Sequence, residues 1–533
     1  MNKKQWIIVI LIFILAIFLR IFNWPNNIND VNCDEAMLAI NAKSIVDSGK
    51  DIYGTSYPVY FESWGRGGQS ALPTYLVALC IKLFGYSLFS VRLPILFITL
   101  TSLIVMFLFS YKAFKNKNIS IIIIILLAIN PWDIVQSQWN LDCNLFPHLI
   151  LIAIYLLYIG IEEKKDIQLY ISMLFFALCL YSYGIALYTV PIFLFLTAIF
   201  CIKNKKITIS KIVCCIVIFI ICSIPIILMT ILNMFNIHTI NIGNMTIQNF
   251  EYVTRQSDML IFSNNKINTL VSNMKSMFTV IIFQYDNNVF SAFKWIGTTY
   301  LISIPFFILG IISSIVGYND KKDKFAKNII INWLLVSIIA GVLINNINIS
   351  RLNIIWYPLI IFSGLGIYEL VENVKIRKFT IPFISIIYII SFGYFLYYYN
   401  NIGINKIINS YTWSKGLVSA INEANNKETS RIMISNNVCN TDKKDVFIRY
   451  ATKFEKEKYF INNKEFSYYF REDKKPNMNF STRDKKYIII NIDENNYLTE
   501  KLYVIDKKEK EKIVNIEDYK EEKHNNYIVL IKK

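Results

Sequence analysis

The chain has 533 residues, of which 54% are hydrophobic, and it carries a formal net charge of +17 at pH 7. Apolar stretches recur along it at about the 17–25 residues that a helix needs to cross a hydrocarbon core, so the expected fold class is a polytopic α-helical membrane protein. Nucleic-acid binding is excluded, because the lysines fall in alternate loops between the apolar stretches and do not form one basic face.

Eleven transmembrane spans are expected from hydropathy and from the charges that flank each apolar stretch. They lie at residues 7–23, 89–111, 119–132, 147–161, 168–183, 185–202, 210–235, 296–318, 328–346, 354–371 and 379–399. The basic residues concentrate in alternate loops, as they do in cytoplasmic loops, at 112–117, 164–165, 203–206, 321–327 and 375–378. This pattern predicts a cytoplasmic N-terminus, and the odd number of spans then places everything after residue 400 outside.

Two expected outer loops are long enough to hold structure. Residues 24–88 should form two surface helices, the first ending at Gly49 and the second, apolar and short, at Leu72–Phe84. The second helix is too short to cross the membrane and is broken by a proline, so an interfacial or re-entrant position is expected. Residues 236–295 form the larger, polar outer loop.

A small α/β domain is expected in the tail, where hydropathy falls and charge rises. A helix-like run at 414–424 precedes strand-like runs at 431–435, 487–492 and 527–531. The chain is therefore expected to divide into a transmembrane domain, residues 1–399, and an extracytoplasmic domain, residues 400–533.

Three acidic residues stand at the outer ends of spans. Asp34 and Glu35 follow the first span, and Asp142 takes the matching place after the third. Such residues can be simple helix caps, because the helix dipole favours acidic residues in any first turn. Spans packed side by side could also bring the carboxylates into one cleft, where an ionised carboxylate can accept a proton. We expect Asp34, Glu35 and Asp142 to be catalytic.

Outer arginines supply the opposite charge. Arg66 lies in a Gly-rich turn, Arg92 begins the second span, and Arg351 begins the tenth. Each could simply extend its charge to a lipid headgroup. The functional alternative is a clamp on a donor phosphate, which a guanidinium binds through paired hydrogen bonds.

Four more residues are expected to line the substrate. Trp64 and Gln69 bracket the Gly-rich turn, and Asn144 and His148 follow the second acidic position. His148 has the alternative interpretation of an interfacial residue. Acids that remove a proton and arginines that hold a phosphate together indicate group transfer from a phosphate-linked donor, because a neutralised phosphate is a good leaving group.

Metal and disulfide chemistry stay open. The nine cysteines show no metal-ligand spacing, but Cys33 and Cys143 each adjoin an outer acidic residue and could pair. A divalent cation held by Asp34, Glu35 and Asp142 is also open, since oxygen ligands suit Mg, Ca or Mn. The three acids have no tight spacing motif that would favour it.

The motifs resemble a known family. The Asp-Glu-Ala run at 34–36, the Arg-Leu-Pro run at 92–94, and Asp142 after the third span are similar to those of the GT-C fold glycosyltransferases of family 39. That group includes protein O-mannosyltransferases and the aminoarabinose transferase of lipid A. The resemblance covers roughly residues 1–200, and the rest of the chain is similar in topology.

The resemblance implies a sugar donor on polyprenyl phosphate, used on the outer membrane face with inversion at the sugar carbon. The acceptor would be a hydroxyl of an envelope glycan, lipid or protein. By this resemblance Asp34 is the general base, Glu35 and Asp142 are supporting acids, and Arg66 is a cation near the lipid phosphate. The chain departs from the aminoarabinose transferases, which carry Glu-Lys-Pro-Pro where residues 64–67 read Trp-Gly-Arg-Gly.

Two other interpretations stay open beside a membrane glycosyltransferase. A transporter or flippase of lipid-linked saccharides would need ionisable residues or broken helices near mid-membrane, whereas Arg20 and Glu369 lie near the ends of their spans. An envelope polysaccharide polymerase or ligase also works at the outer face. It usually uses a diphosphate-linked donor, so the identity of the donor would discriminate.

Overall fold

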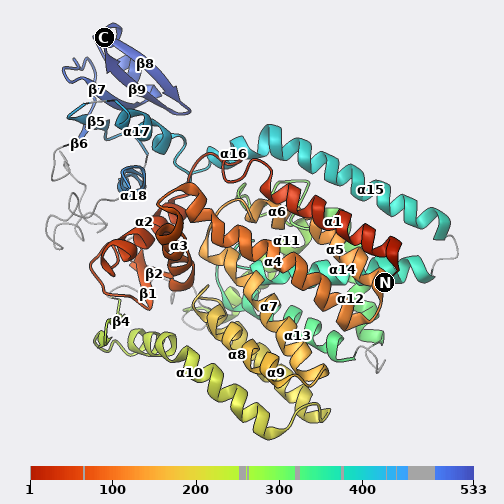
Figure 1. Cartoon of the computed structure of the whole chain (residues 1–533). Coiled ribbons are helices and arrows are strands. Elements are labelled where there is room, and N and C mark those ends of the chain that lie inside the picture. The colour runs from red at the N-terminus through yellow and green to blue at the C-terminus, as the bar shows by residue number, and fades with distance from the viewer. Residues whose placement is uncertain are drawn as a thin grey trace.

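The computed structural model describes the chain except for residues 1, 64–65, 251–259, 261–262, 318–323, 374–376, 428, 440 and 454–485. Figure 1 shows a bundle of long helices and, at one end of it, a small sheet built from the tail. The N-terminus lies at the end of the bundle away from that sheet.

Eight helices of the described part are long and apolar enough to cross a membrane. They are or contain α1 (Lys3–Ile21), α4 (Leu88–Phe114), α7 (Asp142–Glu162), α9 (Ala186–Lys203), α10 (Ile209–Met234), α13 (Lys324–Leu343), α14 (Trp356–Asn373) and α15 (Arg377–Tyr398). Shorter apolar helices are α3 (Ala71–Phe84), α5 (Lys117–Ala128), α8 (Asp166–Leu180) and α12 (Ile304–Val316). Each of the expected spans falls on a helix, three of them on the short α5, α8 and α12. The polytopic helical fold class is confirmed.

The centre of the bundle is α7, and its rim includes α10 and α15. In the most apolar window of α7, 89% of the residues are buried, against 22% in α10 and 17% in the helix that contains α15. Figure 1 places α10 and α15 on opposite sides of the bundle. A helix that is apolar all round belongs in a core, whereas the exposed apolar faces of rim helices suit lipid.

Two glycines let α12 and α14 pack backbone against backbone. A Cβ added at Gly310 would lie 1.9 Å from the Phe362 carbonyl oxygen, and one added at Gly366 would lie 1.9 Å from that of Phe306. Small residues at a helix contact permit such close approach, which matters in lipid because packing replaces the hydrophobic effect as the attraction between helices.

The first outer loop folds around α2 (Cys33–Ser48), which packs on α3. The strands β1 (Tyr60–Ser63) and β2 (Arg66–Ser70) pair with each other, and Gln69 of β2 is hydrogen-bonded to Asp34 of α2. Its end at Gly49, with φ of 69°, is as predicted, because glycine adopts the left-handed conformation without strain. The sequence predicts that this helix lies on the membrane surface with one face exposed. The structure differs from that prediction. It is buried on most sides, since α18 (Thr441–Ala451) of the tail covers it.

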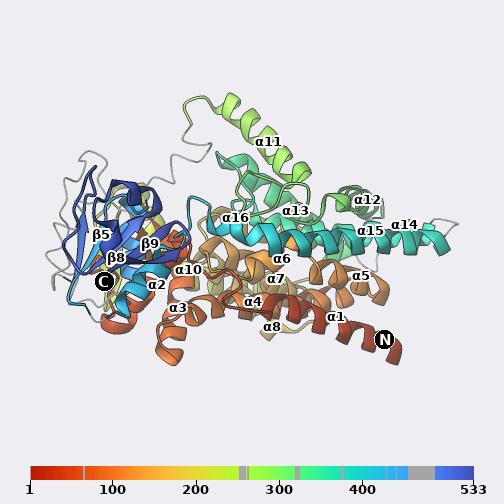
Figure 2. The same ribbon diagram turned by 90° about the horizontal axis from the view of Figure 1, so that it is seen from above.

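The other short elements lie between the long helices along the chain, or after α15 and within the tail. They are α6 (Pro131–Gln136), β3 (Ile240–Ile242), β4 (Met245–Ile247), α11 (Lys266–Phe283), α16 (Ile404–Ile408) and the single turns η2 (Leu301–Ser303), η4 (Asn353–Ile355), η5 (Tyr399–Gly403), η6 (Lys507–Lys512) and η7 (Ile516–Asp518). Figure 2 shows α11 standing away from the bundle.

The tail forms a five-stranded mixed sheet in the order β6-β5-β7-β9-β8. Its strands are β5 (Ile432–Ser435), β6 (Tyr487–Ile490), β7 (Leu502–Asp506), β8 (Tyr519–His524) and β9 (Tyr527–Lys532), accompanied by α17 (Leu417–Asn425) and α18 (Thr441–Ala451). The β6-β5-β7 part is parallel and β9 and β8 pair antiparallel. The small C-terminal mixed α/β fold is therefore confirmed.

Candidate active site

Asp34 lies in the first turn of α2, at the end of the bundle next to the tail. The Asn32 side chain caps this helix, accepting a hydrogen bond from the Asp34 amide at 3.0 Å. The Gln69 side-chain amide donates to the Asp34 carbonyl at 2.9 Å. Asp34 is half-buried, and the helix dipole at this position favours its negative charge.

Asp142 reaches the same junction from another helix. It begins α7, is buried, and accepts a hydrogen bond from the Ser70 hydroxyl at 3.4 Å. Ser70 follows Gln69 directly in the chain, so the first turns of α2 and α7 are both hydrogen-bonded to the junction between β2 and α3. The structure therefore brings Asp34, Gln69 and Asp142 together.

Glu35 and Arg92 form a buried ion pair beside this junction. Arg92 Nε and Nη2 each donate to a Glu35 carboxylate oxygen at 2.9 Å, and both side chains are fully buried. The Asn140 amide adds a 2.9 Å hydrogen bond to the same carboxylate. This pair ties α2 to α4 and to the segment that leads into α7.

The Arg92 guanidinium is saturated by these and three further contacts. It donates to the carbonyl oxygens of Pro25, Ile28 and Asp30 at 2.7–2.8 Å, so all five of its N–H groups have acceptors within the protein. No donor is left for a phosphate, and we propose a positioning role for Arg92 in place of the expected phosphate contact. Because Glu35 neutralises this buried charge, we propose a positioning role for it as well.

The tail contacts the chain immediately before Asp34. The Cys33 amide donates to the Thr412 carbonyl at 2.8 Å, and the Ser414 amide donates to the Val31 carbonyl at 3.0 Å. Asp30 accepts hydrogen bonds from the Ser414 hydroxyl and the Gly416 amide. Burial raises the pKa of Asp30 to about 6. The tail is therefore built into the site and is not a separate appendage.

Tyr411 and Lys443 of the tail lie close to these acids. The Lys443 ammonium donates to the Tyr411 carbonyl at 2.7 Å and sits 4.6 Å from the ring centre. Burial raises the pKa of Tyr411, and the negative charges of Asp34 and Asp286 raise it further. Asp34 and Asp286, which lie in two different outer loops, therefore both act electrostatically on this tyrosine of the tail.

The second outer loop adds Asp286, which contacts the segment leading into Arg351. Asp286 accepts hydrogen bonds from the amides of Asn288 and Ile349 at 2.9 and 2.8 Å, and burial raises its pKa. Arg351 is half-buried, and its Nη1 donates to the Asn345 carbonyl at 2.6 Å. Asp286 is therefore hydrogen-bonded to the backbone of the segment that leads into Arg351, two residues before it.

Asn144 and His148 point into the interior of the bundle. Asn144 is buried and donates to the Trp139 carbonyl at 3.3 Å. His148 lies deeper along α7 and contacts the hydroxyls of Thr99, Ser102 and Tyr357 at 3.2, 3.0 and 2.7 Å. His148 is buried inside the bundle, which does not match the interfacial interpretation, and its substrate-lining role stays a prediction.

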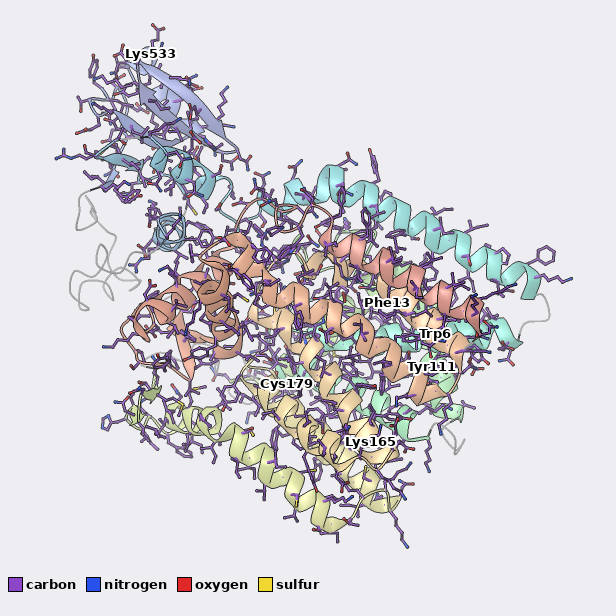
Figure 3. All side chains as sticks on the ribbon, viewed as in Figure 1. Trp6, Phe13, Tyr111, Lys165, Cys179 and Lys533 are labelled. Atoms are coloured by element: carbon purple, nitrogen blue, oxygen red, sulfur yellow. The ribbon has the colours of Figure 1, made fainter. Side chains whose placement is uncertain are left out.

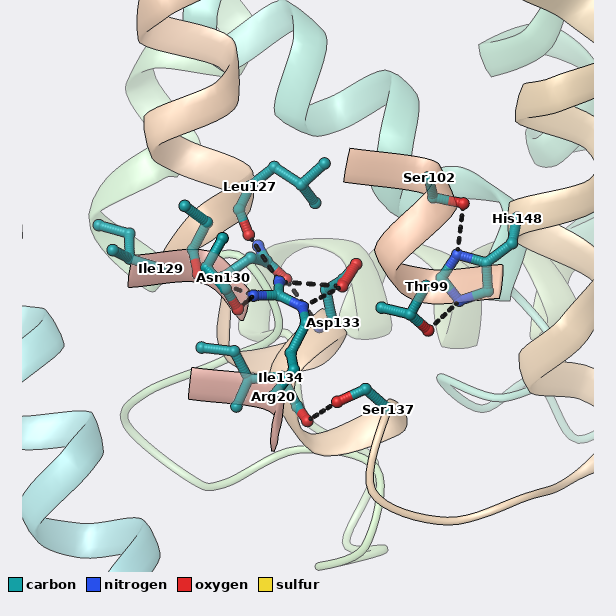
Figure 4. A network of polar contacts seen from close by, with 12 residues as sticks. Arg20, Thr99, Ser102, Leu127, Ile129, Asn130, Asp133, Ile134, Ser137 and His148 are labelled. Atoms are coloured by element: carbon teal, nitrogen blue, oxygen red, sulfur yellow. Dashed lines mark hydrogen bonds and ion pairs between the residues drawn. The ribbon is translucent and has the colours of Figure 1, made fainter. Parts of the chain in front are cut away.

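The same network holds a second buried ion pair. Arg20 donates to Asp133 at 3.0 Å and to the carbonyls of Ala16, Leu127 and Ala128, and Tyr357 links Asp133 to the histidine. Figure 4 shows both ends of this network. Every N–H of the guanidinium has an acceptor, so the charge is stabilised within lipid-spanning helices.

Some predicted residues have no described side chain. Trp64 lies outside the described residues, and Arg66 is placed only by its backbone in β2. Cys33 and Cys143 are both free thiols. In the described part of the chain, no group of three or more His, Cys, Asp or Glu side chains could hold a metal ion.

Several residues at the candidate site were not predicted from the sequence. Asp30 precedes the predicted acids by four positions and Asp286 lies in a predicted outer loop, so both are outer acids that could have been weighed with them. Asn140 stands two residues before a predicted acid. The sequence around Tyr411 and Lys443 does not indicate a role at the site, because nothing in the tail shows which of its residues contact α2.

Comparison with known proteins identifies the class. Residues 69–228 match the family model described as dolichyl-phosphate-mannose-protein mannosyltransferase. Over 99% of its length the chain is similar in structure to 98% of ArnT from Cupriavidus metallidurans bound to undecaprenyl phosphate, with a TM-score of 0.55 and 9% identity. It is also similar, over 94% of its length, to 68% of the oligosaccharyltransferase of Archaeoglobus fulgidus in complex with zinc and sulfate, with a TM-score of 0.53 and 12% identity. A search of curated proteins found no match.

These findings confirm the predicted class, a polytopic membrane glycosyltransferase of the GT-C fold. The family match runs from Gln69 into α10 and so includes Arg92 and Asp142, while α2 with Asp34 precedes it. The structural match to ArnT extends over nearly the whole chain, including the tail.

Proposed function

We propose that this protein moves a sugar from a polyprenyl-phosphate carrier to a hydroxyl of a cell-envelope acceptor, with inversion at the sugar carbon. The observation that carries the proposal is that Asp34 and Asp142, from two different helices, are hydrogen-bonded to the adjacent residues Gln69 and Ser70 at one end of the bundle. Donor and acceptor would meet there, at the membrane surface. The sequence match to a family named for dolichyl-phosphate-mannose supports a donor of this class.

In the proposed reaction, Asp34 removes the proton of the acceptor hydroxyl. The hydroxyl oxygen forms a bond to the sugar C1 as the bond from C1 to the phosphate oxygen breaks. The electron pair of that bond leaves with the polyprenyl phosphate, and attack from the opposite side inverts C1. Asp34 suits this step because it is half-buried in a first turn, where the helix dipole favours its charged, proton-accepting form.

Asp142 is proposed to orient the acceptor. Its Oδ1 accepts a hydrogen bond from the Cys143 amide at 2.8 Å, and its Oδ2 faces the Ser70 hydroxyl. The carboxylate is thus held by its own helix and by the junction that also holds Asp34. A carboxylate fixed in this way contributes by positioning the acceptor hydroxyl, because the rate of catalysis falls steeply when the reacting atoms are misplaced.

The leaving phosphate is proposed to lie near Arg351 and Arg66. With the guanidinium of Arg92 saturated, these are the remaining arginines of the predicted set. ArnT from Cupriavidus metallidurans was solved with undecaprenyl phosphate, so a carrier of that kind is a reasonable first substrate to test. We further propose that the active site faces outward and the N-terminus inward, in line with the distribution of lysines.

The proposal is tested with purified protein, polyprenyl-phosphate hexoses and pentoses, and envelope extracts as acceptors. Asp34→Asn should lower transfer by about 10²–10⁴-fold, the usual contribution of a general base. The matched control is Asp47→Asn on the same helix, where the carboxylate pairs only at the surface with Lys43. Equal activity of Asp34→Asn and the control would remove Asp34 from the mechanism. Activity only with diphosphate-linked donors would instead favour a polymerase or ligase.

A further inference from the structure

A cavity of about 730 Å³ opens at the end of the bundle away from the candidate active site. It lies where the C-terminal ends of α4 and α7 meet the N-terminal end of α5. Helices α4 and α7 both begin near the active site, so at 1.5 Å per residue they separate it from the cavity by roughly 30–40 Å. The cavity is therefore a distinct site.

The cavity has an excess of positive charge. Of its two acidic residues, Glu163 pairs with Lys112 and Lys165, and Glu162 pairs with Lys206. Two other lining residues are lysines, at positions 115 and 117, which are exposed and form no ion pair within the described part of the chain. The acids are thus neutralised by other lysines, and two ammonium groups remain to attract an anion.

The start of α5 adds to this attraction. Asn116 caps the helix, accepting a hydrogen bond from the Asn118 amide at 2.9 Å, and both residues line the cavity. The N-terminus of a helix carries a partial positive charge and favours phosphate groups. Cavity, lysines and helix end therefore favour the same kind of ligand, a phosphate-bearing anion.

Aromatic side chains continue the site along the lipid-facing surface. Phe107 stacks on Tyr111 at a ring separation of 6.0 Å, and it contacts Trp6 and Phe13 of α1 at 6.2 and 6.0 Å. Tyr111 also lines the cavity, and Trp6 is 47% exposed. Figure 3 shows Trp6, Phe13 and Tyr111 along this part of the bundle. A hydrocarbon chain attached to the phosphate would find an apolar surface beside it.

We propose that this cavity binds the phosphate group of an anionic lipid, with the lipid chain lying along α1 and α4. The ligand class is a lipid phosphate monoester or diester. A free phosphate shares the headgroup chemistry but would make no use of the aromatic surface. The proposal does not depend on the transfer reaction, since no residue of the active site takes part in it.

The test is native mass spectrometry of the full chain in detergent, titrated with dioleoyl phosphatidylglycerol, undecaprenyl phosphate or inorganic phosphate. The test variant is Lys115→Gln/Lys117→Gln. The matched control, Lys203→Gln/Lys205→Gln, removes the same charge from a neighbouring loop that does not line the cavity. All four lysines are at the surface, so both variants should fold.

Lipid binding should weaken by about fivefold for each lysine removed from the cavity, and so by about 25-fold in the test variant. The control should bind as the wild type does. Equal weakening in both variants, or no weakening in either, would overturn the proposal. Inorganic phosphate that displaces the lipid at equal concentration would also overturn it, because the ligand would then be a soluble anion.

Discussion

The Glu35–Arg92 pair gives the sharpest prediction about how the site is held. Glu35→Leu removes the carboxylate and leaves a fully buried guanidinium with two N–H groups and the Asn140 amide without their acceptor. Removing one member of a buried pair costs about 3–5 kcal/mol, because the remaining charge stays in a medium that cannot solvate it. The three backbone acceptors of Arg92 remain, so the lower half of this range is expected.

The assay is thermal unfolding of the detergent-purified protein. It compares the single variants Glu35→Leu and Arg92→Met with the double variant Glu35→Leu/Arg92→Met. The double variant should be more stable than either single variant, since no unpaired charge remains in the core. A control pair on the same helix, Lys43→Gln with Asp47→Asn, removes an exposed ion pair and should cost less than about 1 kcal/mol.

The reasoning is refuted if the two single effects simply add in the double variant. Additive effects would mean that each side chain is stabilised by its surroundings and not by its partner. A second readout separates positioning from chemistry: a variant that folds should lose transfer activity less than Asp34→Asn does, because Glu35 does not reach the reacting atoms in the proposed mechanism.

Three further predictions concern packing, pH and the donor. Gly310→Ala should destabilise the protein by about 1–3 kcal/mol in thermal unfolding, because the new Cβ would lie 1.9 Å from the Phe362 carbonyl oxygen, whereas Gly393→Ala, with nothing within 4 Å, should have little effect. The free energy of unfolding should fall as pH rises from about 4 to about 6, because the raised pKa of Asp30 lets the folded state keep a proton that the unfolded state has lost. In Asp30→Asn the fall across this pH range should be weaker. A fall as large as that of the wild type would contradict the assignment. Arg351→Gln should raise the KM for the polyprenyl-phosphate donor roughly ten- to hundredfold with a smaller change in kcat, and an unchanged KM would exclude Arg351 from the phosphate site.

The membrane-spanning helices could be predicted because their determinants are local. In lipid a helix satisfies its own backbone, so an apolar stretch of sufficient length indicates a span without knowledge of its neighbours. The end of α2 at Gly49 was predictable for the same reason, since one residue supplies the left-handed conformation. The strand-like runs of the tail likewise fall on strands β5, β6 and β9.

The roles of individual charges could not be predicted in the same way. An arginine at the end of a span has the same local pattern whether it extends to a headgroup or pairs with a distant acid. Arg92 and Glu35 are 57 positions apart, and only the folded structure reveals that they pair. His148 follows a catalytic candidate closely in sequence, but the helix carries it inward to Tyr357, 209 positions away. Long-range packing therefore decides these roles.

The central claim is that Asp34 removes a proton as the sugar leaves its carrier, and azide rescue tests it most directly. Azide is already an anion, so it can attack the sugar C1 without a base. With a polyprenyl-phosphate sugar, Asp34→Ala should fail to glycosylate hydroxyl acceptors but should form a glycosyl azide of inverted configuration when azide is added. Transfer to hydroxyl acceptors by Asp34→Ala at the wild-type rate, or no glycosyl azide from a variant that still binds the donor, would contradict the account.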